Sequence, residues 1–186
     1  MIYNKIIQAQ TQRTLFSLLI DPENHNSRSL RNLAKGAGEA QVDFILVGGS
    51  LLSERLDACI DLIREETNTP IMLFPGSLMQ VSSRADGILF LSLISGRNPD
   101  LLIGNHVLSA RMIKNSGLEV IPTGYILIEG GGISSVEYIS NTKPIPAGKT
   151  EIITATALAG EMLGHRLIYL EAGSGAPQSI YPPIIQ

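Results

Sequence analysis

Six apolar runs that alternate with amphipathic stretches constrain the fold of this chain more than any other feature. The apolar runs cover residues 13–20, 43–47, 70–74, 87–91, 117–128 and 166–170, and a short helix is expected before the first of them. Apolar residues recur at helical spacing in residues 27–40, 51–66, 100–115 and 149–163. Strands and helices that alternate in this order predict an α/β fold, in which helices cover a parallel sheet.

The positions of the polar residues distinguish between two α/β architectures. A doubly wound sheet and a TIM barrel, (β/α)8, both satisfy the alternation of strands and helices. Five polar residues lie at or just beyond the ends of predicted strands: Asp21, Ser50, Ser92, Glu129 and Glu171. In a TIM barrel these strand ends converge on one mouth, where active sites lie. We therefore favour the barrel.

The barrel expected here is modified in two ways. A TIM barrel has eight strands, whereas only six are recognised before the chain ends at Gln186. We expect residues 1–186 to form a single domain that is truncated after strand 6 and lacks strands 7 and 8. Residues 75–86 are too few for two loops and a full helix, so the third helix should be reduced. That segment is either a plain surface connection or the edge of a groove for a long apolar substrate. Residues 129–147, which are rich in Gly, Ser and Pro, predict a long loop.

Composition and charge exclude several classes of protein. The formal net charge is −3, from 14 basic and 17 acidic residues without a basic block, which argues against nucleic acid as the main partner. No apolar run reaches the roughly 18 residues of a transmembrane helix, and the N-terminus is too polar for a signal peptide. The single cysteine, Cys59, fits a reducing cytoplasm and lies in an apolar helical pattern that predicts a core thiol. We expect a cytoplasmic protein.

The segment 169–175, Tyr-Leu-Glu-Ala-Gly-Ser-Gly, is the main candidate site. A carboxylate at a strand end followed by two glycines and a hydroxyl can form a nest of backbone N–H groups for a phosphate. An ordinary Gly-rich turn after a strand has the same pattern. Beside a bound phosphate, Glu171 is a candidate general base for a substrate hydroxyl; otherwise it is a solvated turn carboxylate. Tyr169 lies on the same face of the strand as Glu171.

Asp21 and Ser50, at the ends of the first two strands, offer hard oxygen ligands. Mg²⁺ accepts such partial coordination when substrate phosphates and water complete its shell. Asp-Pro is also a common turn pair, and Ser50 is equally suited to cap a helix. His25, His106 and His165 show no metal-ligand spacing, and surface or helix-terminal positions are expected for all three.

Six segments together resemble one enzyme family over essentially the whole chain. They are Leu-Ile-Asp-Pro-Glu (19–23), Ile-Leu-Val-Gly-Gly-Ser (45–50), Leu-Phe-Pro-Gly (73–76), Phe-Leu-Ser-Leu-Ile-Ser-Gly-Arg-Asn-Pro (90–99), Ser-Asn-Thr-Lys-Pro-Ile-Pro (140–146) and Tyr-Leu-Glu-Ala-Gly-Ser-Gly (169–175). Their order and spacing resemble the geranylgeranylglyceryl phosphate synthase family, which includes the bacterial heptaprenylglyceryl phosphate synthases. The chain looks more like the second group of that family, found in archaea and some bacteria.

The resemblance implies a modified TIM barrel with an irregular third helix. It also implies a Mg²⁺-dependent transferase that joins sn-glycerol 1-phosphate to a polyprenyl diphosphate, such as geranylgeranyl diphosphate, through an ether bond in lipid biosynthesis. Asp21 and Ser50 match the metal positions, and Glu171 matches the carboxylate that deprotonates the attacking hydroxyl. The glycerol phosphate segment is matched by Tyr169, Leu170, Glu171, Ala172, Gly173, Ser174 and Gly175. Family members also form dimers and larger homo-oligomers.

Two departures from the family pattern and two alternative functions accompany this interpretation. First-group enzymes carry Lys two residues before the metal Asp, where this chain has Leu19, which fits the second group. Family members continue through strands 7 and 8, whose turns supply much of the phosphate site. Another phosphate-binding TIM-barrel enzyme, such as an isomerase or aldolase, is one alternative. Its usual strand-end lysine is not evident, because Lys143 and Lys149 lie in a loop and at a helix start. A non-catalytic remnant is the other alternative.

Overall fold

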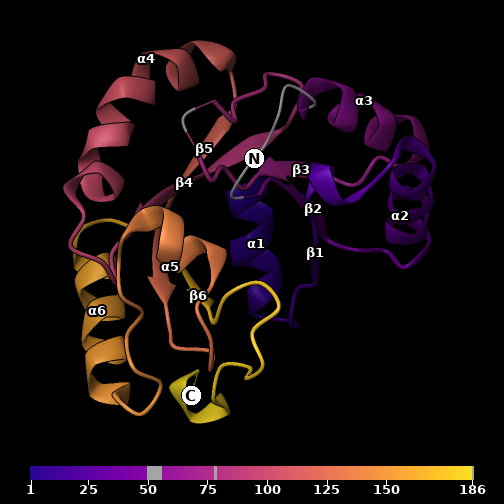
Figure 1. Cartoon of the computed structure of the whole chain (residues 1–186). Coiled ribbons are helices and arrows are strands. Elements are labelled where there is room, and N and C mark those ends of the chain that lie inside the picture. The colour runs from indigo at the N-terminus through magenta and orange to yellow at the C-terminus, as the bar shows by residue number, and fades with distance from the viewer. Residues whose placement is uncertain (50–55, 78, 186) are drawn as a thin grey trace. The chain divides into compact units, whose positions relative to one another are not determined.

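The computed structural model describes residues 1–49, 56–77 and 79–185 of the chain (Figure 1). Six strands form one sheet in the unbroken order β1-β2-β3-β4-β5-β6. Doubly wound sheets reverse their strand order at a switch point, whereas a sheet in chain order is that of a TIM barrel. The strands are β1 (Ser17–Ile20), β2 (Phe44–Val47), β3 (Ile71–Leu73), β4 (Gly87–Leu93), β5 (Glu119–Leu127) and β6 (Leu167–Glu171).

The helices alternate with these strands as the sequence predicts, with one exception. They are α1 (Ile2–Gln10), α2 (Ser27–Glu39), α3 (Leu56–Glu66), α4 (Asn105–Ser116), α5 (Ser135–Ser140) and α6 (Thr150–Met162), with short turns η1 (Pro22–Asn24), η2 (Asp100–Gly104, a π-helix) and η3 (Pro182–Ile184). The exception is α5, because residues 129–147 were expected to form only a loop. The side chain of Ser134 caps α5 by accepting a hydrogen bond from the backbone N–H of Glu137. The pattern Ser-x-x-Glu at these positions is a recognised start of a helix.

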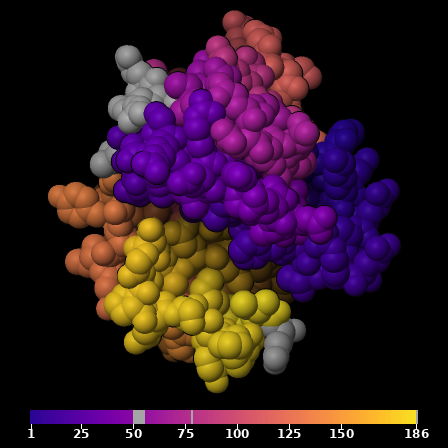
Figure 2. Space-filling model, turned by 90° about the vertical axis from the view of Figure 1, so that its right-hand side faces the viewer, coloured from indigo at the N-terminus to yellow at the C-terminus, as the bar shows by residue number. Residues whose placement is uncertain are grey.

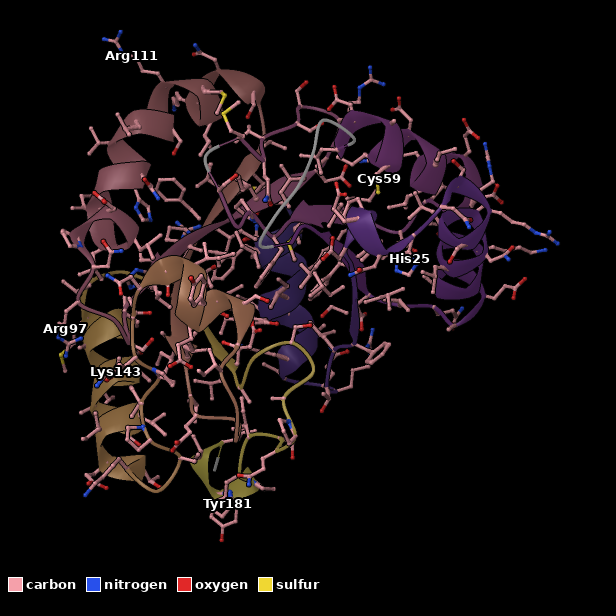
Figure 3. The ribbon with its side chains drawn as sticks, in the orientation of Figure 1. His25, Cys59, Arg97, Arg111, Lys143 and Tyr181 are labelled. Atoms are coloured by element: carbon pink, nitrogen blue, oxygen red, sulfur yellow. The ribbon has the colours of Figure 1, made fainter. Side chains whose placement is uncertain are left out.

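The chain divides into two compact units, of which the first comprises residues 1–89 and 110–120. Its core contains isoleucines from successive strands, including Ile20, Ile45 and Ile71, all fully buried. Cys59, labelled in Figure 3, is buried on α3, which confirms the predicted core thiol. Glu119 accepts hydrogen bonds from the backbone N–H groups of α1's first two residues, and so satisfies donors that a helix start leaves unpaired.

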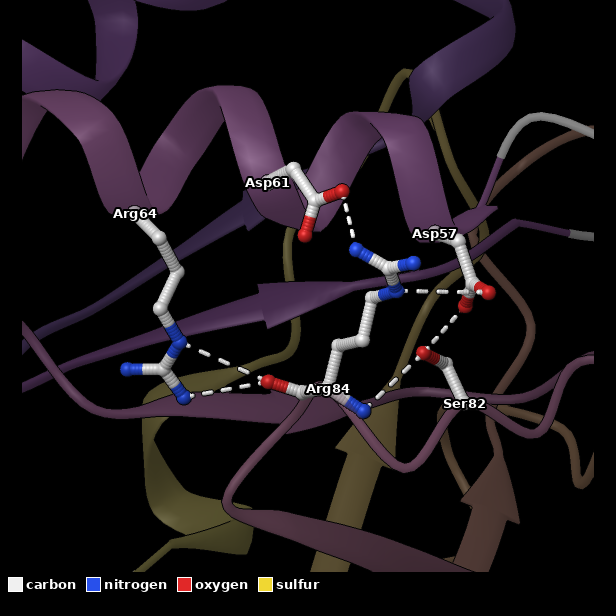
Figure 4. A network of polar contacts seen from close by, with 5 residues as sticks. All are labelled: Asp57, Asp61, Arg64, Ser82 and Arg84. Atoms are coloured by element: carbon white, nitrogen blue, oxygen red, sulfur yellow. Dashed lines mark hydrogen bonds and ion pairs between the residues drawn. The ribbon is translucent and has the colours of Figure 1, made fainter.

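The segment between β3 and β4 contains no helix in its described residues, as its length predicts. Polar side chains tie it to α3 instead (Figure 4). Ser82 donates a hydrogen bond to Asp57 at 2.5 Å. Arg84 forms ion pairs with Asp61 and Asp57, and the guanidinium of Arg64 donates to the backbone oxygen of Arg84. We call these five residues the Arg84 network. In place of a full helix between β3 and β4, the described residues form a loop, and polar side chains of this loop contact α3.

The second unit comprises residues 90–109 and 121–186. Its apolar cluster lies between α6 and one face of β5 and β6. Side chains alternate between the two faces along a strand. Tyr125 of β5 and Tyr169 and Glu171 of β6 therefore lie on the face opposite the cluster. The cluster consists of Ile126, Ile128, Ile145 and Ile153, packed against residues that include Ala157, Ile168 and Leu170.

His106 lies at a helix start, one of the two kinds of position expected for the histidines. It lies in the first turn of α4, but it is buried rather than on the surface. Its Nε2 lies 3.0 Å from the hydroxyl of Ser92, and its ring meets Phe90 edge to face at 4.5 Å. Ser92 lies next to the end of β4, as the sequence predicts, and its side chain points toward α4. Burial lowers the pKa of His106, which keeps the ring neutral.

Candidate functional site

A cluster of one carboxylate and two tyrosines occupies the end of β5 and β6. Parallel pairing places Tyr125 opposite Tyr169 and Leu127 opposite Glu171. The tyrosine rings stack with centroids 5.5 Å apart and an interplanar angle of 16°. The Tyr125 hydroxyl reaches diagonally across the strands and donates a hydrogen bond to Oε2 of Glu171 at 2.5 Å. The sequence prediction that Tyr169 and Glu171 share a face agrees with this geometry.

Burial and the nearby carboxylate raise the pKa of both tyrosines. Tyr125 is only 5% exposed. Burial is the main cause of its raised pKa, and the charge of Glu171 acts in the same direction. The same two causes raise the pKa of Tyr169 to about 12. Both phenols therefore keep their protons at neutral pH, so Tyr125 acts toward Glu171 as a hydrogen-bond donor.

The turn that follows Glu171 depends on glycine at one critical position. Gly173 has a backbone φ of +101°, a conformation that side chains with a Cβ rarely adopt. A Cβ at this position would also come within 2.6 Å of the Cβ of Ser134. The turn thus packs closely against the residues that lead into α5, while Ser174 and Gly175 remain exposed. The residues after β6, yellow in Figure 2, lie on the outer surface.

The side chains of the predicted glycerol phosphate segment therefore point to two different sides of β6. Tyr169 and Glu171 share the face of the Tyr125 hydroxyl, whereas Leu170 packs its side chain into the apolar cluster beside α6. The backbone of Ala172 lies close to Gly130: a Cβ added at Gly130 would lie 2.3 Å from the backbone oxygen of Ala172. Leu170 can therefore contribute only backbone groups to a ligand that binds on the Glu171 face.

The first unit holds the predicted metal ligand Asp21 at the end of β1. Its Oδ1 accepts a hydrogen bond from the backbone N–H of Glu23 at 3.1 Å, so Asp21 also caps η1. A Cβ at Gly49 would lie 2.7 Å from Oδ2 of Asp21, so the carboxylate lies directly against a glycine at the end of β2. The second predicted ligand, Ser50, lies outside the described residues. Among the described residues, no three His, Cys, Asp or Glu side chains gather into a metal cluster.

The remaining candidates occupy positions that agree with the sequence analysis. Lys143 is exposed after α5, and Lys149 is exposed immediately before α6, so neither lies at a strand end. Nδ1 of His165 lies 2.9 Å from the backbone oxygen of Gly160 beyond the end of α6. His25 pairs with Ser29 near the start of α2. Within the part of the chain that the structure describes, no helix is long and apolar enough to cross a membrane.

Sequence analysis missed Tyr125, the residue that contacts Glu171 directly. Nothing in the run Glu119–Leu127 distinguishes Tyr125 from a core tyrosine, because its partner is 46 positions away along the chain. One signal was available: if β5 and β6 are paired as neighbouring parallel strands, the two tyrosines can be aligned as opposite residues, which the observed register confirms.

Comparisons with known proteins give a consistent result. Residues 7–185 match the model of the PcrB family. A geranylgeranylglyceryl phosphate synthase from Chitinophaga pinensis is 50% identical, over 99% of this chain and 74% of the relative. The crystal structure of (S)-3-O-geranylgeranylglyceryl phosphate synthase from Thermoplasma acidophilum, in complex with its substrate sn-glycerol-1-phosphate, is 30% identical with a TM-score of 0.92. It covers 98% of this chain, and this chain spans 74% of it.

A more distant likeness concerns the fold alone. The tryptophan synthase alpha chain from Legionella pneumophila is 12% identical with a TM-score of 0.51, over 91% of this chain and 75% of that one. The TIM-barrel expectation is confirmed.

The family model extends over nearly the whole chain, and the relatives share up to half of its residues. The chain belongs to the PcrB family, the family of the geranylgeranylglyceryl phosphate synthases.

Proposed function

We propose that this protein is a prenyltransferase of ether-lipid biosynthesis, which joins sn-glycerol 1-phosphate to a polyprenyl diphosphate and releases diphosphate. The Chitinophaga and Thermoplasma relatives are named for this product with a geranylgeranyl chain. The observation that carries the proposal is the Glu171 carboxylate, held by a tyrosine donor at a strand end and followed by a glycine turn. Such a carboxylate can take the proton of a substrate hydroxyl, and the glycine turn beside it allows a phosphate to approach the backbone closely.

Glu171 is the proposed general base. The glycerol hydroxyl becomes a stronger nucleophile as its proton passes to the carboxylate. The hydroxyl oxygen then forms a bond to the allylic carbon of the prenyl chain, and the bond from that carbon to the diphosphate oxygen breaks. The diphosphate leaves with the electron pair, and the proton remains on Glu171. Neutral Tyr125 and Tyr169 cannot take that proton, which leaves the carboxylate as the base within the cluster.

Residues 169–175 are proposed to bind and orient the glycerol phosphate. The ring of Tyr169 lies on the same face of β6 as Glu171. The turn through Gly173 and Gly175 follows the end of β6, and its backbone groups are available there for the phosphate. Holding the hydroxyl next to the base and facing the allylic carbon lowers the barrier by removing the entropy cost of bringing them together.

Asp21 and Ser50 are the proposed ligands of Mg²⁺. The carboxylate of Asp21 suits this hard cation, which is bound in proteins through one or two carboxylates, water and substrate phosphates. The close approach of Asp21 to Gly49 fits such a role, because a larger residue would displace the carboxylate. When bound, the metal supplies positive charge that neutralises the departing diphosphate. We expect the reaction to take place in the cytoplasm, in keeping with a single cysteine that is buried in the core.

The test is a transfer assay with radiolabelled sn-glycerol 1-phosphate and prenyl diphosphates of increasing chain length, with and without Mg²⁺. The proposal predicts a labelled ether lipid that forms only when Mg²⁺ is present. It also predicts a preference for one range of chain lengths. Absence of any labelled lipid, with every prenyl diphosphate from farnesyl to heptaprenyl, would overturn the assignment.

A further inference from the structure

We propose that Tyr125 is a positioning residue for Glu171: it holds one carboxylate oxygen so that the other is presented to the substrate hydroxyl. This inference rests on the proposed function and extends it to a residue on a different strand. Three features of the second unit support it: the hydrogen bond, the burial of the donor, and the packing that fixes the donor's ring.

The hydrogen bond divides the two oxygens of Glu171 between two tasks. Tyr125 donates to Oε2 at 2.5 Å, a length typical of a bond from a hydroxyl to a carboxylate. A carboxylate that accepts this bond through Oε2 can turn only by breaking it. Oε1 is therefore held in one direction, as a base must be when it meets a hydroxyl within hydrogen-bonding distance.

Burial keeps the Tyr125 hydroxyl protonated, so it remains a hydrogen-bond donor. Tyr125 is nearly inaccessible to water, and its raised pKa keeps the phenol protonated throughout the range in which an enzyme works. It can neither accept the substrate's proton nor lose its own to Glu171. The hydroxyl of Tyr125 therefore keeps its direction as Glu171 gains and loses a proton.

Packing fixes the ring that carries this hydroxyl. Tyr125 and Tyr169 are opposite each other on paired strands, and their rings stack at 5.5 Å. Stacking across a parallel pair leaves the Tyr125 ring little freedom to rotate, and so sets the height of its hydroxyl beside Glu171. A side chain whose own rotamer is locked in this way can hold a reactive group in a productive geometry.

The first test replaces Tyr125 by Phe, which removes the hydroxyl and keeps the ring. We expect kcat to fall about tenfold to a hundredfold, the loss expected of one hydrogen bond to a charged group, while KM for glycerol phosphate changes little. The acidic limb of the kcat profile should move to higher pH, because a carboxylate that loses a donor holds its proton more firmly. Tyr138→Phe is the matched control, since Tyr138 is 83% exposed on α5 and should leave both quantities unchanged.

A double-mutant cycle shows whether Tyr125 acts through Glu171. Tyr125→Phe should cost far less in a Glu171→Gln background than in the wild type, because the amide cannot act as the base that Tyr125 positions. Equal losses in both backgrounds would overturn the inference, as would a Tyr125→Phe enzyme with wild-type kcat and pH profile. Should that variant not fold, fluorotyrosine at position 125 keeps the ring and strengthens the donor. The acidic limb should then move to lower pH, and an unmoved limb would refute the inference.

These outcomes separate the inference from the function on which it rests. If the wild-type protein forms no ether lipid, the proposed function fails and the role of Tyr125 fails with it. If the wild type is active and Tyr125→Phe matches it, only the role of Tyr125 fails.

Discussion

Two polar networks in this chain differ in exposure and therefore in what they can do. The ion pairs of the Arg84 network in the first unit lie in water: the side chains of Arg84, Asp61 and Asp57 are 50%, 45% and 60% exposed. In the second unit, Tyr125 is 5% exposed where it meets Glu171. Water screens the exposed charges, so their pairing adds little to stability. The hydrogen bond from buried Tyr125 to half-buried Glu171 is less screened, and so it is stronger and costlier to break. We therefore expect substitutions in the ion pairs of the Arg84 network to have small effects and substitutions around Glu171 to have large ones.

The largest effect is expected for Glu171→Gln. Loss of the general base should lower kcat by about two to four orders of magnitude, while the amide keeps the size of the side chain and still accepts from Tyr125. Steady-state turnover and the melting temperature should be measured together. Turnover close to the wild-type value would remove Glu171 from the mechanism and erase the contrast between the two networks.

The next effect concerns the glycine turn beside Glu171. Gly173→Ala should lower the free energy of unfolding by about 1–3 kcal/mol, because a Cβ strains the backbone at this φ and meets Ser134. Urea unfolding measures this loss. Gly117→Ala is the control, since its φ is also positive but no atom lies within 4 Å of the added Cβ. The control should lose less stability; equal losses would show that the contact with Ser134 carries no cost.

A third, smaller effect depends on pH and involves Asp43. Its carboxylate accepts hydrogen bonds from the guanidinium of Arg13 and from the backbone N–H of Phe16. The bond from Arg13 is the main reason that the pKa of Asp43 falls from 3.8 to about 2. Because the folded protein has the lower pKa, this stabilisation is complete above about pH 4 and is lost as pH falls toward 2.

Urea midpoints of the wild type and of Asp43→Asn test this expectation. The wild type should be the more stable of the two at neutral pH, and the difference should shrink as the pH is lowered through that window. A difference that stays constant down to pH 2 would show that the charge of Asp43 plays no part in its contribution.

The smallest effect is expected for Arg84→Met, which keeps the apolar stem and removes the charge. Turnover should be unchanged, and any decrease in melting temperature should vanish at high salt, because screening already weakens these pairs. Arg111→Met provides the control for loss of a positive charge, at an exposed position on α4 labelled in Figure 3. A large, salt-independent decrease at Arg84 alone would mean that the Arg84 network is as important to its unit as the Tyr125–Glu171 pair is to its own.

Much of the fold could be predicted because it depends on local pattern. The six apolar runs became the six strands, and the short connection between β3 and β4 correctly excluded a full helix. The helix α5 was missed because Gly and Pro around it suggest a loop, although Ser134 and Glu137 carry the pattern of a helix start. The burial of His106 at the start of α4 was not predicted, because one histidine in a helix gives no sign that Ser92 and Phe90 of β4 will cover it.

The candidate site was predictable only along one strand. Tyr169 and Glu171 are two residues apart, so the alternation of a strand places them on one face without further knowledge. Tyr125 could not be found in this way, because its contact with Glu171 depends on the register of β5 against β6. The side chain of Leu170 turned out to serve the apolar cluster, which strand alternation alone would have indicated. The metal ligands Asp21 and Ser50 and the base Glu171 remain predictions.

The central claim is that a glycerol hydroxyl, activated by Glu171, attacks the prenyl chain. Its most direct test uses sn-glycerol 1-phosphate labelled with heavy oxygen in its primary hydroxyl, with mass spectrometry of both products. Attack by that hydroxyl predicts that the label appears in the ether bond of the lipid and that the released diphosphate is unlabelled. A prenyl product without the label, or label in the diphosphate, would contradict the account.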